Sequence, residues 1–277
     1  MNDRQSTVIR PDTQIIDVSY IKEILNFKDL YIILSLRDIR IRYKQTLLGI
    51  GWVIFQPLIT TAIFTLLFGK FTPLSHEKLP YPVFVYIGLV YWTYFSNALT
   101  VTSGSLIVNE SIIKKVYFPK IIVPIASLSG IILDFCVSST LLILMLVIYK
   151  VPTTWVFWVN YVVGFLLLTV FITGVGLLLC ALNVKYRDVR FIVPFFIQTF
   201  IFLTPVFYSL NIVSPSNRWI LSLNPMSLII ESARDTLSKG VFMAQGSWVI
   251  TIIVTAISLI AGFVYFRRAE KHIADIL

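Results

Sequence analysis

Residues able to perform covalent chemistry are few in this chain, and their spacing matches no catalytic motif. The two histidines, His76 and His272, lie in polar segments that the topology of the chain places on opposite sides of a membrane, so they offer no metal-binding pair. The Gly69-Lys70 pair resembles the end of a phosphate-binding loop. Such a loop needs a glycine where this chain has Phe64, and a Ser or Thr after the lysine. We therefore predict that the chain binds no ATP through this motif.

A run of basic residues precedes the first long apolar segment. Residues 28–45 read KDLYIILSLRDIRIRYKQ, in which Arg37, Arg40 and Lys44 share one helical face while leucines and isoleucines share another. This pattern predicts a helix over 28–48 that lies in the membrane interface, with its basic face toward anionic head groups. The short alternation IRIRYK leaves a strand as the alternative.

One acidic residue, Asp134, falls inside an apolar segment and is the best candidate for a charge within the membrane. Such charges are typical of ion-coupled transport. A single acid without a basic partner in the apolar segments gives little support to a proton relay. We therefore expect Asp134 to make a hydrogen bond in the helix packing, to a hydroxyl such as Ser138 or Thr140.

Aromatic residues are numerous, with 21 Phe, 13 Tyr and 6 Trp, and two groups of them fall inside apolar segments. Rings in such places either pack against helices and lipid or line a pathway on which sugar faces stack. A ring-lined pathway would suit a long neutral or weakly charged glycan better than a small ion. The two groups are Tyr91, Trp92, Tyr94 and Phe95, and Phe195, Phe196, Phe200 and Phe202.

The composition indicates the environment in which these residues operate. The chain has 277 residues, of which 57% are hydrophobic and 13% charged, and its mean hydropathy is +0.85. A soluble domain carries about 25% charged residues and a disordered chain has low hydrophobicity, so both classes are excluded. Long unbroken apolar runs predict membrane helices rather than a barrel, whose strands alternate. The net charge of +9 then reflects basic residues beside the membrane and not a nucleic-acid partner.

Six apolar segments are long enough to cross a bilayer, which takes about 20 residues. We therefore predict one all-α integral membrane domain over 1–277. The expected spans are about 50–68, 81–106, 121–149, 155–182, 191–210 and 248–266. The fifth is expected to be kinked or re-entrant because it contains two prolines. In the fourth span, Gly174 and Gly176 predict close helix packing.

The distribution of Lys and Arg predicts the orientation. The segments expected on one side carry most of the 23 basic residues, which places both termini in the cytoplasm. These segments are the N-terminal segment 1–27 with the interfacial helix, the loops 107–120 and 183–190, and the tail 267–277.

The segment 211–247 between the last two spans is amphipathic in two pieces, which divide at Asn224-Pro225. The first piece contains Trp219, and in the second the apolar side chains lie opposite Glu231 and Arg234. We expect two short helices that rest on the outer surface, with a helical loop of no special role as the alternative.

Several motifs, in order along nearly the whole chain, resemble one family. The stretch from Arg37 to Phe71, with L-G-x-x-W and Pro57, resembles the start of permease subunits of ABC polysaccharide exporters, which belong to the type-2 class of ABC export permeases. NESIIKKVYFPK resembles the first cytoplasmic loop of this family, NVKYRDV the second, and LNPMS the segment between its outer helices. The resemblance is strongest to O-antigen exporter permeases, with capsule and teichoic acid exporter permeases as near relatives.

The resemblance implies a transport subunit rather than an enzyme. Two copies of the permease would pair about a dyad, each bound by a separate ATPase subunit that carries ATP and Mg²⁺, while the permease itself holds no cofactor. Together they would move a polyprenyl-diphosphate-linked polysaccharide outward through the bacterial inner membrane. The missing phosphate-binding loop agrees with this division of roles.

The resemblance also implies contacts with the ATPase and with the lipid. The loop 107–120 is the expected coupling helix, unless it is only a topology anchor; its residues are Glu110, Lys114, Lys115, Tyr117 and Phe118. In the second loop, Arg187 and Asp188 either couple to the ATPase or form a local ion pair that caps a span. The lipid diphosphate, or ordinary anionic lipid, would meet Arg37, Arg40, Arg42 and Lys44.

Two further sets of residues would serve the polysaccharide path. The channel would be lined by Tyr91, Trp92, Tyr94, Phe195, Phe196 and Phe200. An outer gate would be formed by Trp219, Asn224, Pro225, Glu231 and Arg234.

Three other functions fit parts of the pattern. A type-2 permease for a drug or small lipid shares the class, but the first-span motif and the aromatic content favour a polysaccharide. A membrane-embedded enzyme should show paired acids or a basic-histidine cluster on one side of the membrane, and the sequence shows neither. An ion-coupled transporter should show several intramembrane charges or paired broken helices, whereas only the fifth span is broken.

Overall fold

The computed structural model describes residues 18–44, 51–69, 79–214, 218–240 and 245–276, and every regular element in them is a helix. Residues 1–17, residues 45–48 of the expected interfacial helix, and His76 lie outside the described residues. The helices are α1 (Val18–Asn26), α2 (Lys28–Tyr43), α3 (Gly51–Phe68), α4 (Tyr81–Val108), α5 (Glu110–Ile113), α6 (Ile122–Ile148), α7 (Trp155–Lys185), α8 (Val189–Phe200), a 3-10 turn (Leu210–Ile212), α9 (Arg218–Ser222), α10 (Pro225–Lys239) and α11 (Gln245–Ile276).

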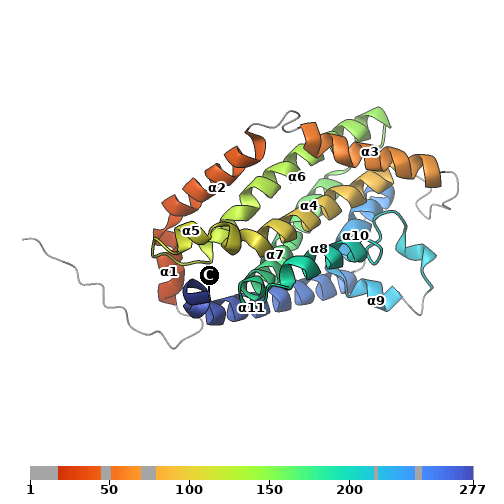
Figure 1. Ribbon diagram of the computed structural model, residues 1–277. Coiled ribbons are helices and arrows are strands. Elements are labelled where there is room, and N and C mark those ends of the chain that lie inside the picture. The colour runs from red at the N-terminus through yellow and green to blue at the C-terminus, as the bar shows by residue number, and fades with distance from the viewer. Residues whose placement is uncertain (1–17, 45–50, 70–78, 215–217, 241–244, 277) are drawn as a thin grey trace, which may run out of the picture.

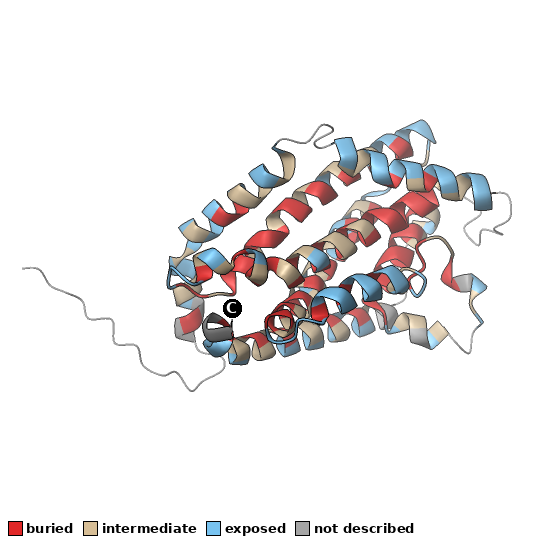
Figure 2. Ribbon diagram, viewed as in Figure 1, coloured by how far each residue is buried: buried red, intermediate tan, exposed pale blue. Residues whose placement is uncertain are grey.

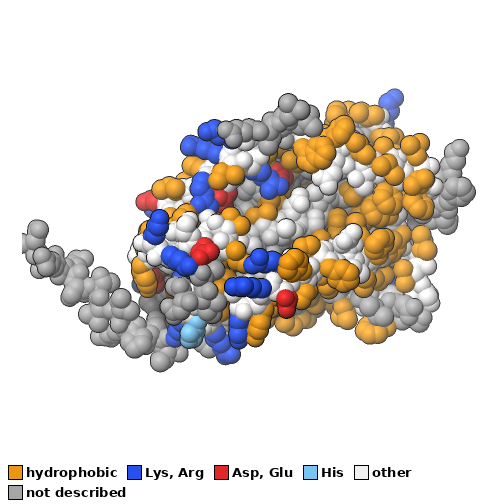
Figure 3. All heavy atoms as spheres, in the orientation of Figure 1, with side chains coloured by type: hydrophobic (Ala, Val, Ile, Leu, Met, Phe, Trp, Pro, Cys, Tyr) orange, Lys and Arg blue, Asp and Glu red, His pale blue; other side chains and the backbone are white. Residues whose placement is uncertain are grey.

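Four long helices, α4, α6, α7 and α11, run along an elongated bundle (Figure 1). Helix α4 packs against α6 and α7, and α7 packs against α11. Helices α1 and α5 and the C-terminal end of α11 lie at one end, and α9 lies at the other. Lys and Arg side chains gather mostly around the first end, while hydrophobic side chains cover much of the remaining surface (Figure 3). We call the first end the basic end.

Four of the described helices are long and apolar enough to cross a membrane: Gly51–Phe68, Ile122–Ile148, Trp155–Lys185 and Trp248–Ile273. Helix α4 has 28 residues, about 42 Å of helix, but more of them are polar. Most of its side chains are buried, because α3, α6, α7, α8 and α10 pack around it (Figure 2). Its lower hydropathy follows from being covered by protein rather than lipid.

The segment 191–210, expected as a kinked or re-entrant fifth span, is not one continuous helix. Helix α8 has 12 residues and ends at Phe200, and turns and bends follow over residues 201–208. Twelve residues make about 18 Å of helix, which is less than the hydrocarbon core of about 30 Å. Pro205 has no amide hydrogen to continue the helix, which agrees with the expected break.

The predicted close packing at Gly174 and Gly176 is confirmed. A Cβ atom at Gly174 would lie 2.5 Å from the backbone nitrogen of Leu259 in α11, and one at Gly262 would overlap the carbonyl oxygen of Gly174. A Cβ atom at Gly176 would lie 2.7 Å from the methyl group of Thr102 in α4. The two glycines of α7 thus allow two neighbouring helices to approach closely.

We expect Gly174→Ala to lower the free energy of unfolding by about 1–3 kcal/mol, because the added methyl group forces the backbone of α11 away. Thermal unfolding of the purified protein in detergent measures this effect. The control is Gly104→Ala in α4, where a Cβ atom meets nothing within 4 Å and alanine favours the helix. Equal melting temperatures for wild type and Gly174→Ala would contradict the packing argument.

Helices α9 and α10 divide at Asn224-Pro225, as predicted. The side chain of Asn224 accepts a hydrogen bond from the backbone N–H of Met226 at 3.0 Å, and Gly240 ends α10 with φ of 70°. The expectation that both helices rest on the surface is wrong for α10. From Pro225 to Leu237, all its side chains except that of Asp235 are buried, and the helix packs against α7, α4 and α11.

Candidate functional site

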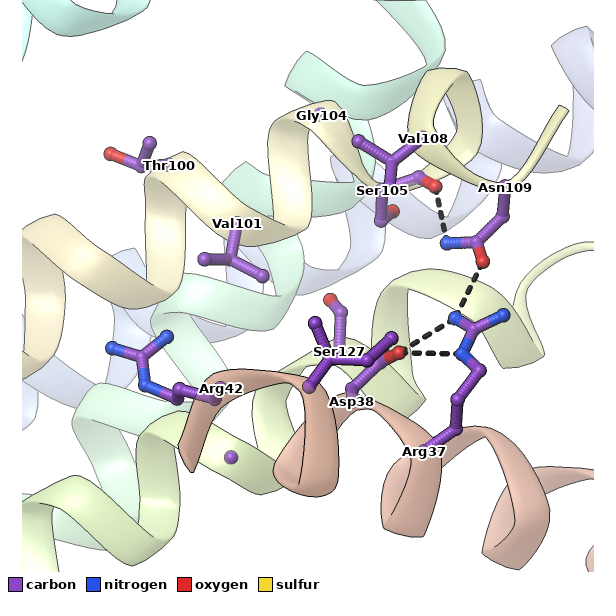
Figure 4. Close-up of a pocket in the computed structure, with 12 residues that line it drawn as sticks. Arg37, Asp38, Arg42, Thr100, Val101, Gly104, Ser105, Val108, Asn109 and Ser127 are labelled. Atoms are coloured by element: carbon purple, nitrogen blue, oxygen red, sulfur yellow. Dashed lines mark hydrogen bonds and ion pairs between the residues drawn. The ribbon is translucent and has the colours of Figure 1, made fainter. Parts of the chain in front are cut away.

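A cavity of about 490 Å³ lies between α2, α4 and α6 (Figure 4). Helix α2 contributes Arg37, Asp38 and Arg42 to its wall, and Asn109 lies at the end of α4. Arg37 pairs with Asp38 inside this lining, and Arg42 pairs with Asp134, which lies outside it. We call this space the cationic cavity after its two arginines.

Arg37 links α2 to the end of α4. Its Nε and Nη2 atoms donate to Oδ1 of Asp38 at 2.9 and 2.6 Å, and Nη2 also donates to Oδ1 of Asn109 at 2.6 Å. The sequence predicted that Arg37, Arg40 and Lys44 share one outward face of this helix. This prediction is wrong for Arg37, because its side chain bonds to Asp38 and Asn109. Arg40 and Lys44 are exposed, as the interfacial prediction requires.

Arg42 forms an ion pair with Asp134, the acidic residue of the expected third span. Its Nη2 atom lies 2.5 Å from Oδ2 of Asp134 in α6, and the hydroxyl of Tyr43 donates to Oδ1 of the same carboxylate. The expected partners of Asp134, Ser138 or Thr140, are thus wrong. The reason is that α2 packs against α6 and brings a cation to an acid that is only 5% exposed.

We expect a double-mutant cycle of Arg42→Gln and Asp134→Asn to give a coupling energy of about 1–3 kcal/mol, because the two side chains contact each other directly. Thermal unfolding of the four proteins in nanodiscs measures it. The matched pair is Lys239→Gln with Asp235→Asn, an i,i+4 pair at 2.8 Å with an exposed lysine, for which we expect less than about 0.5 kcal/mol. Additive effects at positions 42 and 134 would show that their ion pair contributes nothing.

The expected coupling loop forms the short helix α5 followed by an exposed turn. Glu110 pairs with Lys114 at 2.5 Å, and both Lys115 and Tyr117 are exposed, Tyr117 by 76%. Phe118 is 4% exposed, so the expectation that it projects toward a partner is wrong. Its ring belongs to the apolar cluster that joins the helices at the basic end.

An anchor centred on Glu270 fixes this end of the bundle, and sequence reasoning missed it. The hydroxyl of Tyr20 donates to Oε2 of Glu270 at 2.9 Å, and the backbone N–H of Lys120 donates to Oε1 at 2.7 Å. Arg267 pairs with Glu270 at 3.0 Å and stacks 3.4 Å above the Tyr20 ring. Burial and, next, the Glu270 charge raise the pKa of Tyr20, so its hydroxyl stays a donor.

Helix α1 could have been found in the sequence. Its apolar residues, Val18, Tyr20, Ile21 and Ile24, follow a helical spacing, although residues 1–27 were expected only as a polar N-terminal segment. The anchor itself gave no such signal, because its members come from three distant parts of the chain. We call Tyr20, Lys120, Arg267 and Glu270 the Glu270 anchor.

The second loop is short and exposed. Arg187 and Asp188 lie between α7 and α8 with exposed side chains, and neither forms an ion pair with another described residue. Asp188 precedes α8 without a side-chain capping bond. The local ion pair is therefore not observed, and contact with a partner subunit stays a prediction.

The two groups of aromatic residues differ in their surroundings. Tyr91, Trp92 and Tyr94 are buried, and the hydroxyl of Tyr91 donates to the carbonyl of Tyr161 at 2.9 Å. The expectation that these three rings line an open channel is wrong, because helices of the same chain cover them. The rings on α8 do project outward: Phe195 is 70% and Phe196 53% exposed, and Phe200 stacks on Phe196.

The expected outer gate contains a buried charge pair. Arg234 is fully buried, and its guanidinium lies 3.5 Å from Glu231. It donates to the carbonyls of Phe84, Pro205 and Val206, which joins α10 to α4 and to the turns after α8. Glu231 also accepts from the hydroxyl of Ser209 at 2.9 Å. The prediction that Glu231 and Arg234 lie on a solvated face is wrong. Both side chains are buried, and the Ser209 hydroxyl and the backbone carbonyls make the hydrogen bonds that water would otherwise make.

The remaining residues expected in the gate divide between surface and core. Trp219 on α9 is 63% exposed, whereas Asn224 is buried and its Nδ2 atom donates to Thr204 at 3.0 Å. Pro225 occupies the first turn of α10, where its missing N–H is no loss. Asn224 and Pro225 thus define the helix start, and the gating role of all five residues stays a prediction.

Comparisons with known proteins agree with this arrangement. The sequence model of the family described as ABC-2 type transporter matches residues 29–238. The O-antigen export system permease protein RfbA of Klebsiella pneumoniae is 27% identical over 255 residues, which cover 90% of this chain and 95% of the relative. A protein of the same name in Myxococcus xanthus is 27% identical over 218 residues, covering 78% of this chain and 82% of the relative.

A third relative is named for a different substrate. The polysialic acid transport protein KpsM of Escherichia coli is 24% identical over 246 residues, which cover 86% of this chain and 92% of the relative. The family match spans α2 to α10, and therefore includes the cationic cavity, the loop with α5 and the buried Arg234. This chain belongs to the ABC-2 type transporter family of membrane proteins.

Proposed function

We propose that the chain is the membrane-spanning permease of an ATP-driven exporter for a polyprenyl-diphosphate-linked polysaccharide of the O-antigen type. The observation that carries this proposal is the cationic cavity, whose lining includes both Arg37 and Arg42. A diphosphate requires such paired, charge-assisted donors. The names of the Klebsiella and Myxococcus relatives support the polysaccharide. The permease performs no covalent chemistry in this proposal.

The proposed orientation places the basic end in the cytoplasm of a bacterium. Residues of α1, the loop with α5, the end of α7 and the end of α11 meet in one apolar cluster, which includes Tyr20, Ile113, Val184 and Ile273. These are the segments predicted on the cytoplasmic side of the inner membrane. Helix α4 and the α8–α10 region would complete six crossings around the four apolar spans.

The proposed partners are a second copy of the chain and two copies of a separate ATPase subunit, which holds ATP and Mg²⁺. Lys115, Tyr117, Arg187 and Asp188 are exposed at the basic end and would receive the motion of the ATPase. The exposed rings of Phe195 and Phe196 would face the polysaccharide path or lipid. Transport proceeds toward the periplasm when the ATPase closes.

A capsular polysaccharide is the second candidate substrate, because KpsM also matches most of the chain. Teichoic acid and a small lipid or drug complete the set of alternatives. Composition analysis of the trapped glycan distinguishes these candidates directly, since each has its own sugars or none.

The test is deletion of the gene in its host, followed by fractionation of polyprenyl-linked glycan. We expect long glycan to accumulate on the cytoplasmic side, with none at the surface. Wild type and Lys239→Gln should restore surface glycan, whereas Arg37→Gln should restore little. Normal surface glycan in the deletion strain, with no second exporter present, would overturn the proposed function.

A further inference from the structure

A second cavity, of about 230 Å³, lies between α3, α4 and α6. Arg42 lines both this cavity and the cationic cavity, so the two spaces meet at one guanidinium group. The volume is below the roughly 300–1,000 Å³ of pockets that hold drug-sized ligands. The second cavity is therefore suited to a single small ring.

The charge of the second cavity differs from that of the first. Its charged lining residues are Arg42 and Asp134, which pair with each other at 2.5 Å and cancel. The cationic cavity is lined by Arg42 without Asp134, and by Arg37 together with its partner Asp38. A neutral ligand thus suits the second cavity, whereas the first offers the Arg42 guanidinium to an anionic group.

Four polar side chains line the second cavity without a hydrogen-bond partner in the described part of the chain: Gln56, Thr93, Asn97 and Ser138. Thr93 and Asn97 are half-buried on α4, among helices that form the membrane domain. Unpaired amides and hydroxyls are costly at membrane depth. Their donors and acceptors together match a ligand with several neighbouring hydroxyl groups.

Aromatic rings complete the lining, which includes Tyr94 and Phe135 besides Trp52. Trp52 of α3 lies at this cavity and is 53% exposed, so its apolar face is accessible to a ligand. An indole face beside amide groups suits a sugar ring, which has an apolar face and a polar edge. A drug-like apolar molecule would leave the amides unpaired.

We propose that the second cavity is the subsite for the first sugar of the lipid-linked glycan, with Gln56, Thr93 and Asn97 as its hydrogen-bonding residues. This inference rests on the proposed function. In such a substrate the sugar is bonded directly to the diphosphate, so their two subsites must adjoin. The cavities adjoin at Arg42, which contacts the phosphate side while the Asp134 carboxylate faces the sugar side.

The experiment measures binding of two probes to the purified full-length permease in nanodiscs. One probe is a polyprenyl diphosphate, and the other is the same lipid bearing a single N-acetylglucosamine. Wild type should bind the sugar-bearing lipid more tightly. Thr93→Val and Asn97→Leu should weaken the sugar-bearing lipid roughly three- to tenfold each and leave the sugar-free lipid unchanged, because one hydrogen bond is lost. Thr140→Val, at an exposed hydroxyl outside the cavity, should change neither.

The outcomes separate this inference from the proposed function. Equal affinity of wild type for both lipids, or equal weakening of both by Thr93→Val, would overturn the sugar subsite while export of the glycan still stands. Sugar-selective binding that persists in both variants would place the sugar elsewhere and likewise overturn the subsite. If neither lipid binds and the deletion strain has normal surface glycan, the proposed function fails. Asn97→Leu that binds both lipids poorly with an unchanged Thr93→Val would assign Asn97 to packing and also reject the subsite.

Discussion

Replacing Arg234 by Met is expected to lower the free energy of unfolding by about 3–5 kcal/mol, because it leaves the Glu231 charge buried without its cation. The guanidinium donates at 3.0 Å to the carbonyl of Phe84 and at 2.6 Å to those of Pro205 and Val206. These carbonyls would lose their donor in a region of low dielectric constant. The apparent melting temperature of the permease in detergent measures the loss.

The control for this prediction is Lys239→Met on the same helix. Lys239 is exposed and pairs only with Asp235 in an i,i+4 arrangement, so we expect a change within about 0.5 kcal/mol. Arg234→Lys should lie between the two variants, since an ammonium keeps the charge but cannot reach three separated carbonyls. Equal melting temperatures for Arg234→Met and Lys239→Met would show that the buried contacts of Arg234 do not stabilise the fold.

Space for the guanidinium is provided by a glycine on α4. A Cβ atom at Gly88 would lie 2.7 Å from Nη2 of Arg234 and 2.7 Å from the carbonyl oxygen of Val206. The guanidinium also lies 3.6 Å from the centre of the Phe84 ring, so it has a cation–π contact as well. Arg234, Gly88 and the turns after α8 therefore act as one packed unit, which holds α10 inside the bundle.

The contrast between the apolar spans and this buried unit shows which parts of the fold could be predicted from the sequence. The apolar runs predicted α3, α6 and α7 within a few residues, because lipid exposure requires continuous hydrophobicity. Helix α11 begins near the expected sixth span but continues through most of the expected tail to Ile276. The burial of Glu231 and Arg234 was not predictable. A charge in an amphipathic pattern indicates a solvated face unless its partners are known, and here the partners are carbonyls up to 150 residues away.

The cationic cavity likewise has features that the sequence predicted and features that it could not predict. The basic residues of α2 predicted an element that binds anions, and Arg37 and Arg42 do line a cavity. Binding of an anion there stays a prediction. Their inward orientation depends on the packing of α2 against α6, which no local pattern contains. The neighbouring rings of α4 were misread for a related reason. A buried tyrosine and a channel-lining tyrosine look alike in sequence. The structure distinguishes them, because Tyr91 is buried and donates to the carbonyl of Tyr161.

Replacing Glu270 by Leu is expected to abolish export while the protein remains in the membrane. The change removes the carboxylate that accepts hydrogen bonds from the Lys120 amide and the Tyr20 hydroxyl. Each donor that is left unsatisfied costs about 1–3 kcal/mol of folding free energy. Lys120 is the last residue of the expected coupling loop, and Tyr20 holds α1 against α11. Loss of the anchor should therefore let the loop shift, so that motion of the ATPase no longer reaches α6.

The measurement pairs surface glycan with ATP hydrolysis by the reconstituted complex. For Glu270→Leu we expect surface glycan at the level of the deletion strain and continued hydrolysis of ATP. Tyr20→Phe removes only one hydrogen bond, about 1 kcal/mol, so it should fold and export at a reduced rate. Asp29→Leu, an exposed acid at the same end, is the control and should export normally. Normal export by Glu270→Leu would show that the Glu270 anchor supports the fold of α1 alone and that force reaches α6 through the exposed residues of the loop.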